Sequence, residues 1–311
     1  MTSDAAAGHA RLARFAWVVT LYTVGVILFG AWVRVTGSGA GCGEHWPTCH
    51  GEVVPRAPSV KTVIEFTHRL TSGLDGLLIA ALFVMVRSVL PAGHNARAWA
   101  LRAGLFLIVE AALGAALVKF GLVAEDTSRA RIFVVAIHLI NTLLLVGSIA
   151  MVALSLTPHA TGNGDTRGIR RTVTAGGLYL LICAMGAVTA LGDTLFPIVF
   201  GADPAHLVPS EESAHFLERV RLIHPLVAVV GSLFLLKVGS EAADAGGPQQ
   251  RPGRLLVWGI LAQTAIGVAN IALSAPAWMQ LVHLCAANFV WLALVWLGAC
   301  YRTPNGSGAR L

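Results

Sequence analysis

Eight continuous apolar runs, each long enough to cross a lipid bilayer, limit what this chain can fold into. A helix needs about 20 apolar residues to span the hydrocarbon core. The composition agrees, because 56% of the 311 residues are apolar and 12% are charged, against about 25% charged in soluble domains. Disordered chains, coiled coils and ordinary soluble enzymes are excluded. A β-barrel is disfavoured because its strands would alternate apolar and polar residues. We therefore predict an all-α integral membrane protein with eight transmembrane helices. The predicted spans are 15–35, 62–87, 99–119, 132–156, 171–191, 218–238, 255–273 and 277–300.

Basic residues gather at alternate connections, which predicts the orientation of the chain. Of the 22 lysines and arginines, thirteen lie near the two chain ends or flank the second, fourth and sixth loops. The positive-inside rule then places both termini in the cytoplasm. The loops of about 36–61 and 192–217 become the large external ones. The net charge of +6 is thus a topology signal, and without a basic-aromatic motif no nucleic-acid binding is expected.

The two halves of the sequence resemble each other in short segments that occur in the same order. The matches are Glu110–Gly114 with Gln263–Gly267, Ile137–Leu139 with Val282–Leu284, and more loosely Gly30–Val33 with Gly186–Thr189. Four spans per repeat would give both halves the same orientation in the membrane. We predict two pseudo-symmetric four-helix bundles, the alternative being coincidence among alanine- and glycine-rich helices. The predicted halves are 1–160 and 161–311.

Four of the eleven histidines lie within the predicted spans, at one common depth. They are His68, His138, His224 and His283, on the four even-numbered spans and five to seven residues inside the external end. Ionisable residues inside a membrane are costly and usually functional. A lone histidine is more often a satisfied polar group, but four at one depth favour metal ligation. Two imidazoles from facing helices can hold a haem iron, whereas a structural zinc site needs about four clustered ligands.

The two histidine pairs differ in the charge beside them. Glu65 is three residues before His68 and shares its helix face, while Arg221 has the same offset from His224. This difference indicates a reactive site in the first half and an electron-transfer site in the second. The alternative for Glu65 is a solvated carboxylate at a helix start.

Five arginines lie at the predicted external rim, against the overall charge trend. They are Arg34, Arg69, Arg131, Arg219 and Arg221. Arginine binds carboxylates in a bidentate manner, so these side chains, Arg69 and Arg221 above all, are candidates to hold haem propionates. Contact with lipid headgroups or with loop acids is the alternative, and the sequence leaves both open.

Two cysteines share the first external loop. Cys42 and Cys49 are separated by six residues that include Gly43 and Pro47. An oxidising external compartment makes a disulfide plausible. A redox-active dithiol is the alternative, and a metal site with His45 or His50 is a weaker one.

Together these motifs resemble the haem A synthase family over essentially the whole chain. The resemblance rests on the run from Arg34 to Gly39, the Cys42–Cys49 loop with Trp46 and Pro47, Glu65 with His68 and Arg69, His138 with Asn141, His224 with Pro225, and His283. It implies eight helices in two pseudo-symmetric bundles and oxidation of the C8 methyl of haem O, by successive hydroxylation, to the formyl of haem A.

The resemblance also implies roles for individual residues. It places a haem b cofactor between His224 and His283 and the substrate haem O near His68 and His138. Glu65 matches the carboxylate that the family requires for catalysis. Cys42 and Cys49 match its external cysteine pair. Some bacterial members carry a second pair between spans five and six, which this sequence lacks.

Two other functions fit the pattern of helices and histidines. One is a membrane b-type cytochrome that only transfers electrons, for example from quinol, and the other is a transporter whose histidines relay protons. For the synthase, the expected partners are the lipid bilayer, a quinone or other electron acceptor, a haem O synthase and a second copy of the chain. The abundance of arginine over lysine and the absence of a recognisable transit peptide predict a bacterial plasma membrane.

Overall fold

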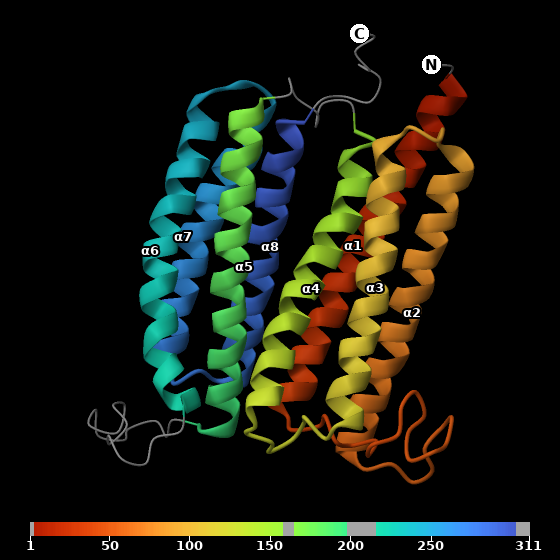
Figure 1. Ribbon diagram of the computed structural model, residues 1–311, viewed down its shortest axis with the longest axis vertical. Helices are drawn as coiled ribbons and strands as arrows, with labels where there is room; N and C mark the ends of the chain where they lie inside the picture. The colour runs from red at the N-terminus through yellow and green to blue at the C-terminus, as the bar shows by residue number, and fades with distance from the viewer. Residues whose placement is uncertain (1–2, 158–164, 198–215, 303–311) are drawn as a thin grey trace.

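Eight long α-helices make up most of the chain (Figure 1). The computed structural model describes residues 3–157, 165–197 and 216–302. All eight helices are long and apolar enough to cross a membrane, which confirms the predicted all-α class and its eight spans. The helices are α1 (Ser3–Val35), α2 (Val60–Val89), α3 (Asn95–Lys119), α4 (Arg129–Leu154), α5 (Thr166–Leu195), α6 (Phe216–Asp244), α7 (Gln250–Ala272) and α8 (Ala277–Cys300).

Several helices begin or end beyond the predicted spans. The N-cap of α2 is Ser59, whose side chain accepts a hydrogen bond from the backbone N–H of Thr62. Ser128 caps α4 in the same way for Arg131. A capping serine satisfies N–H groups that the first turn leaves free, so the helix starts where the cap allows. Hydrophobicity marks the membrane segment and not the helix end.

The helices form two groups of four, which stand side by side (Figure 1). Within α1–α4 and within α5–α8, consecutive helices contact each other, and the last helix of each group returns to the first. The groups meet where α4 contacts α5 and α8 and where α1 contacts α8. At this interface the indole Nε1 of Trp291 donates to the carbonyl oxygen of Leu143 at 2.6 Å. The grouping matches the two predicted halves, while their relation by a symmetry axis stays a prediction.

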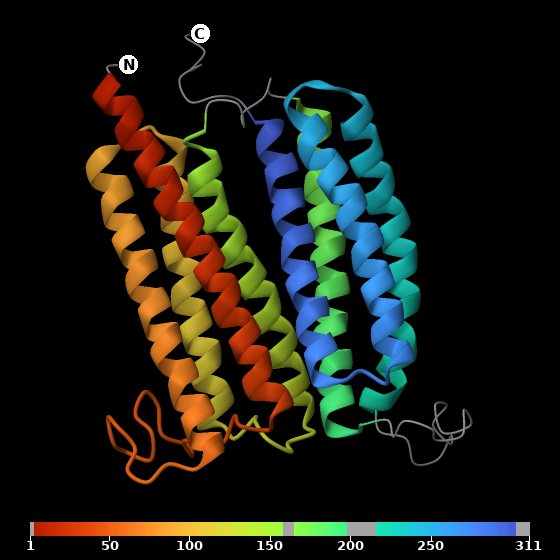
Figure 2. The same cartoon turned by 180° about the vertical axis from the view of Figure 1, so that it is seen from behind.

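The start of α1 and the end of α8 lie at the same end of the molecule (Figure 2). The loop that joins α1 to α2 and the short turn that joins α7 to α8 lie at the opposite end. An even number of spans requires this arrangement. Most of the predicted external loop 192–217 lies outside the described residues, and the cytoplasmic placement of the termini stays a prediction.

Candidate functional site

The four intramembrane histidines occupy similar positions on α2, α4, α6 and α8. They lie six to nine residues beyond the first residue of their helices, which is about 9–14 Å along the axis. For α2, α4 and α6 this is slightly deeper than the sequence predicted, because these three helices begin earlier than their predicted spans. His68 interacts electrostatically with His138, and His224 with His283. The structure therefore brings the predicted members of each pair close together.

The histidine rings carry buried nitrogen atoms that the chain itself leaves unsatisfied. In the described residues, the Nδ1 atoms of His68, His224 and His283 are buried and have no hydrogen-bond partner, while Nδ1 of His138 has a carboxylate oxygen of Glu110 at 3.3 Å. Buried polar groups are normally satisfied, so three unsatisfied ring nitrogens at one depth need an explanation. Paired imidazoles with few hydrogen-bond partners in the chain fit the haem that the resemblance implies.

Glycine stands opposite three of these four rings. A Cβ atom built on Gly30 would lie 3.1 Å from Cε1 of His68, and one on Gly186 or on Gly267 would lie 3.1 Å from Cε1 of His224 or of His283. Such contacts are tighter than ordinary van der Waals packing, so a larger residue would press on each ring. Gly30 and Gly186 are the two glycines of the looser sequence match. We call each glycine in close contact with a histidine ring a glycine cradle. The space that these glycines leave beside the rings also fits bound haem. Among the described residues, no three His, Cys, Asp or Glu side chains gather into a metal-ion site.

Glu65 is buried and fully engaged, so its interpretation as a solvated carboxylate is wrong. Only 3% of the residue is exposed. Its Oε2 accepts a hydrogen bond from the backbone N–H of Cys42 at 2.8 Å, and its Oε1 forms an ion pair with Arg69. One helical turn separates Glu65 from His68. The carboxylate is thus fixed to the α1–α2 loop, one helical turn from His68.

Arg69 holds the α1–α2 loop against α2. Its Nη1 donates to the carbonyl oxygens of His45 and Thr48, each at 2.6 Å. In the same loop, Cys42 and Cys49 form a disulfide and are fully buried. The loop and the Glu65–Arg69 pair therefore form one connected structure at the end of the first helix group where α1 ends and α2 begins.

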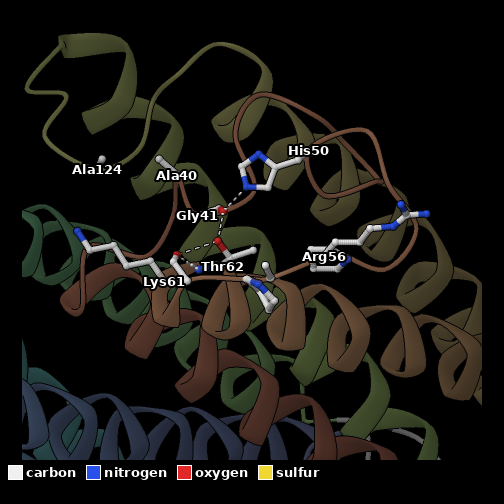
Figure 3. A pocket seen from close by; sticks show the side chains of 12 residues that line it. Ala40, Gly41, His50, Arg56, Lys61, Thr62 and Ala124 are labelled. Carbon is white, nitrogen blue, oxygen red and sulfur yellow. Dashed lines mark hydrogen bonds between the residues drawn. The ribbon is translucent and has the colours of Figure 1, made fainter.

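A cavity of about 560 Å³ lies between this loop and the first turn of α2. On its wall, Thr62 Oγ1 donates to the carbonyl oxygen of Gly41 at 2.7 Å, and Nε2 of His50 lies 2.9 Å from the same oxygen (Figure 3). Lys61 and Arg56 also line it. None of the four intramembrane histidines is among its lining residues.

Two of the other arginines predicted at the rim, Arg34 and Arg221, bind the chain itself. Arg34 donates to the carbonyl oxygen of Ala190 at 2.5 Å and to Thr194 Oγ1 at 2.6 Å, which ties α1 to α5. Nε of Arg221 lies 2.7 Å from Oδ1 of Asp193. Sequence reasoning had not found these contacts. The predicted role of Arg69 and Arg221 in holding haem propionates stays a prediction.

Sequence reasoning also missed Glu110 on α3 as a site residue, although it is a carboxylate within a membrane span. Its Oε1 lies 3.3 Å from Nδ1 of His138. In the second helix group, Nε2 of Gln263 lies 3.2 Å from Nε2 of His283. The available signal was the sequence match itself, which places Glu110 and Gln263 at equivalent positions.

Comparison with known proteins identifies the family to which this sequence is similar. Residues 13–295 match the COX15-CtaA family model, described as cytochrome oxidase assembly protein. A Thermus thermophilus protein named protoheme IX farnesyltransferase is 46% identical over 302 residues, which is 92% of this chain and 48% of that protein. The chain thus spans about half the length of this relative.

Shorter matches come from proteins named heme A synthase. The one from Exiguobacterium sp. is 40% identical over 107 residues, which is 34% of this chain and 36% of that protein. The one from Alkalihalophilus pseudofirmus is 40% identical over 113 residues, which is 36% of this chain and 38% of that protein.

Proposed function

The chain belongs to the cytochrome oxidase assembly protein family, and from that premise we propose that it is a haem A synthase. Its reaction is the oxidation of the C8 methyl of haem O, by successive hydroxylation, to the formyl group of haem A. The observation that carries the proposal is the pair of intramembrane histidines in each helix group, whose members lie near enough to interact electrostatically. One pair serves a substrate haem and the other serves a cofactor haem.

In this proposal the two halves of the chain have different tasks. His224 and His283 hold haem b, with Gly186 and Gly267 giving their rings room. His68 and His138 hold haem O, with Gly30 against the ring of His68. The bound haem b supplies one-electron redox chemistry. The helices supply position and charge.

Glu65 is the proposed catalytic carboxylate. Loss of two electrons and one proton from a methyl group on the conjugated ring leaves positive charge at that carbon, and the quinone or other oxidant takes up the two electrons. A carboxylate near the carbon stabilises the charge or accepts the proton that is lost. The hydrogen bond from Cys42 N and the ion pair with Arg69 keep the Glu65 carboxylate at the external end of the site, where it needs no reorganisation during the reaction.

The proposal also covers the surroundings of the enzyme. The predicted cytoplasmic termini and the bias of arginine toward their side support a multi-pass protein of a bacterial plasma membrane. A quinone or another oxidant accepts the electrons, and a haem O synthase supplies the substrate.

The decisive experiment uses a bacterium that makes haem O but no haem A. After expression of the chain, membrane haems are extracted and separated by chromatography with mass detection. Haem A or its hydroxymethyl precursor is the expected product. Haem O that remains unconverted on a purified, haem-containing protein, with oxygen and a quinone present, would instead indicate a cytochrome that only transfers electrons.

A second host separates this function from the one that the Thermus relative's name describes. In a bacterium that makes protohaem but no haem O, the synthase leaves the haem pool unchanged. Formation of haem O in that host would indicate farnesyl transfer and would contradict the proposal.

A further inference from the structure

Glu110 is held in place by three side chains of the neighbouring helix. On α4, Asn141 Nδ2 donates to Glu110 Oε2 at 2.6 Å, Thr142 Oγ1 donates to Oε1, and Nδ1 of His138 lies 3.3 Å from Oε1. Asn141 also donates to the carbonyl oxygen of Phe106 at 2.9 Å. Residues three and four positions apart share a helix face, so this face of α4 is built around one carboxylate. A carboxylate inside a membrane span is costly, which marks the arrangement as functional.

The second helix group lacks this arrangement. The sequence matches that pair Glu110 with Gln263 and His138 with His283 also pair Asn141 with Ala286 and Thr142 with Ala287. The carboxylate and both side chains that donate to it are therefore replaced together by neutral or apolar residues. Gln263 faces Nε2 of His283 at 3.2 Å, and its own Oε1 is buried without a partner.

The two histidines consequently present different ring atoms to their neighbours. His138 turns Nδ1 toward Glu110, whereas His283 turns Nε2 toward Gln263. A carboxylate beside one nitrogen of a ligating histidine fixes the orientation of the ring and makes the other nitrogen a stronger electron donor. More electron donation and a nearby negative charge both favour the oxidised form of the iron.

We propose that Glu110 is a positioning residue that holds His138 by its Nδ1 side and thereby presents Nε2 to the haem iron of the first helix group. In this role Glu110 gives that haem a lower reduction potential than a neutral residue would. The inference rests on the proposed function only in taking His138 as an iron ligand. If Glu110 has this role, the two helix groups differ in the reduction potential of their haems as well as in their proposed catalytic tasks.

The test measures reduction potentials on the purified full-length protein loaded with protohaem. Optical redox titration of His138→Ala and His283→Ala first assigns each component to a helix group by its disappearance. Glu110→Gln then removes the charge with almost no change in shape and copies the residue of the second half. We expect only the His138-dependent component to shift to higher potential, with protohaem affinity at that site reduced about 10- to 100-fold.

Three further variants separate this effect from general loss of charge or of structure. Asp75→Asn removes another buried carboxylate of the same helix group, which Thr23 binds at 2.9 Å, and should shift the component much less than Glu110→Gln. Gln263→Glu adds a negative charge at the position that the sequence match pairs with Glu110, beside the ring of His283, and should lower the potential of the His283-dependent component. The Gln263→Glu variant still tests the proposal if the Glu110→Gln protein does not fold. Glu110→Asp keeps the charge and should restore most of the lower potential.

Three results would overturn the inference: no shift in Glu110→Gln, an equal shift in Asp75→Asn, or a shift of the His283-dependent component instead. The outcome is independent of haem O conversion. A shift as expected in a protein that converts no haem O would overturn the proposed function and keep the inference. Conversion without any shift would overturn the inference alone.

Discussion

Glu65 links helix α2 to the α1–α2 loop, and its charge is the property to test. Glu65→Gln keeps a carbonyl acceptor for the N–H of Cys42 but removes the negative charge that Arg69 binds. We expect haem A formation to be lost, because the charge that stabilises the reacting carbon is gone. The haem b spectrum should remain nearly unchanged, since His224 and His283 lie in the other helix group. Haem extraction and optical spectra of the same membranes measure both.

The matched control is Glu52→Gln in the same loop. Glu52 pairs with Arg56, whose side chain is 91% exposed, and such exposed pairs contribute little. This variant should retain haem A formation. Product formation at the wild-type level in Glu65→Gln would remove Glu65 from the catalytic role.

The glycine cradle at His224 gives a second prediction at the residue scale. Gly186→Ala places a methyl group 3.1 Å from Cε1 of His224, and overpacking of this kind costs about 1–3 kcal/mol. We therefore expect haem b binding to weaken about five- to 150-fold. Gly177→Ala on the same helix is the control, because its Cβ meets no atom within 4 Å. Haem content per protein decides, and equal content in the two variants would show that the cradle does not matter.

The residue scale also shows where sequence reasoning stops. The histidine pairs could be predicted because imidazoles in apolar runs are rare and their spacing is visible along the chain. The partners of Glu65 could not be predicted, because Cys42 is 23 positions away and its N–H reaches the Glu65 carboxylate only after the loop folds back. Glu110 was overlooked because its partners Asn141 and Thr142 lie on another helix.

At the scale of single elements, the start of α3 depends on a titratable cap. Nδ1 of His94 accepts a hydrogen bond from the backbone N–H of Ala96 at 3.1 Å. Burial and the nearby His9 hold the pKa of His94 below its ordinary 6.5. The neutral ring is therefore the capping form. Its contribution is complete above the unfolded pKa and is lost as the pH falls from about 6.5 toward the lower folded pKa, because the unfolded chain takes up the proton first.

His94→Asn tests this cap, because asparagine caps helices well and does not titrate. We expect the unfolding temperature of the wild type to fall more than that of His94→Asn between about pH 8 and pH 5.5. A cap is worth about 1 kcal/mol, so the difference is small but measurable by thermal unfolding in detergent. Parallel curves for the two proteins would contradict the prediction.

The elements themselves could be read from the sequence almost completely. Each apolar run became one helix because unsatisfied backbone groups are intolerable in a bilayer, whatever the tertiary contacts are. The ends differed where capping residues such as Ser59 and Ser128 start a helix before the apolar run. α1 starts twelve residues before its predicted span, because polar residues outside the membrane can continue a helix.

At the scale of the whole molecule, the contact between the two helix groups depends on Trp291. Its indole Nε1 donates a hydrogen bond to the carbonyl oxygen of Leu143. A Cβ atom built on Gly147 would lie only 3.0 Å from the same Nε1, so the indole packs closely against this glycine. Trp291→Phe removes the donor and part of the buried ring. We expect a loss of stability of about 0.5–1.5 kcal/mol from the hydrogen bond alone, seen as a lower unfolding temperature.

Trp258→Phe on α7 is the control for this interface. Trp258 is 70% exposed on the surface of the helix bundle, so its replacement should change the unfolding temperature little. If both variants lose the same stability, the indole of Trp291 has no special role between the helix groups.

The common position of the two chain ends has a consequence for covalent assembly. Because α1 begins and α8 ends at the same end of the molecule, a second membrane domain fused to either end of this helix bundle would start at that end and would need no added crossing segment. Such a tether would keep the two domains in one patch of bilayer and raise the effective concentration of any lipophilic molecule that passes between them.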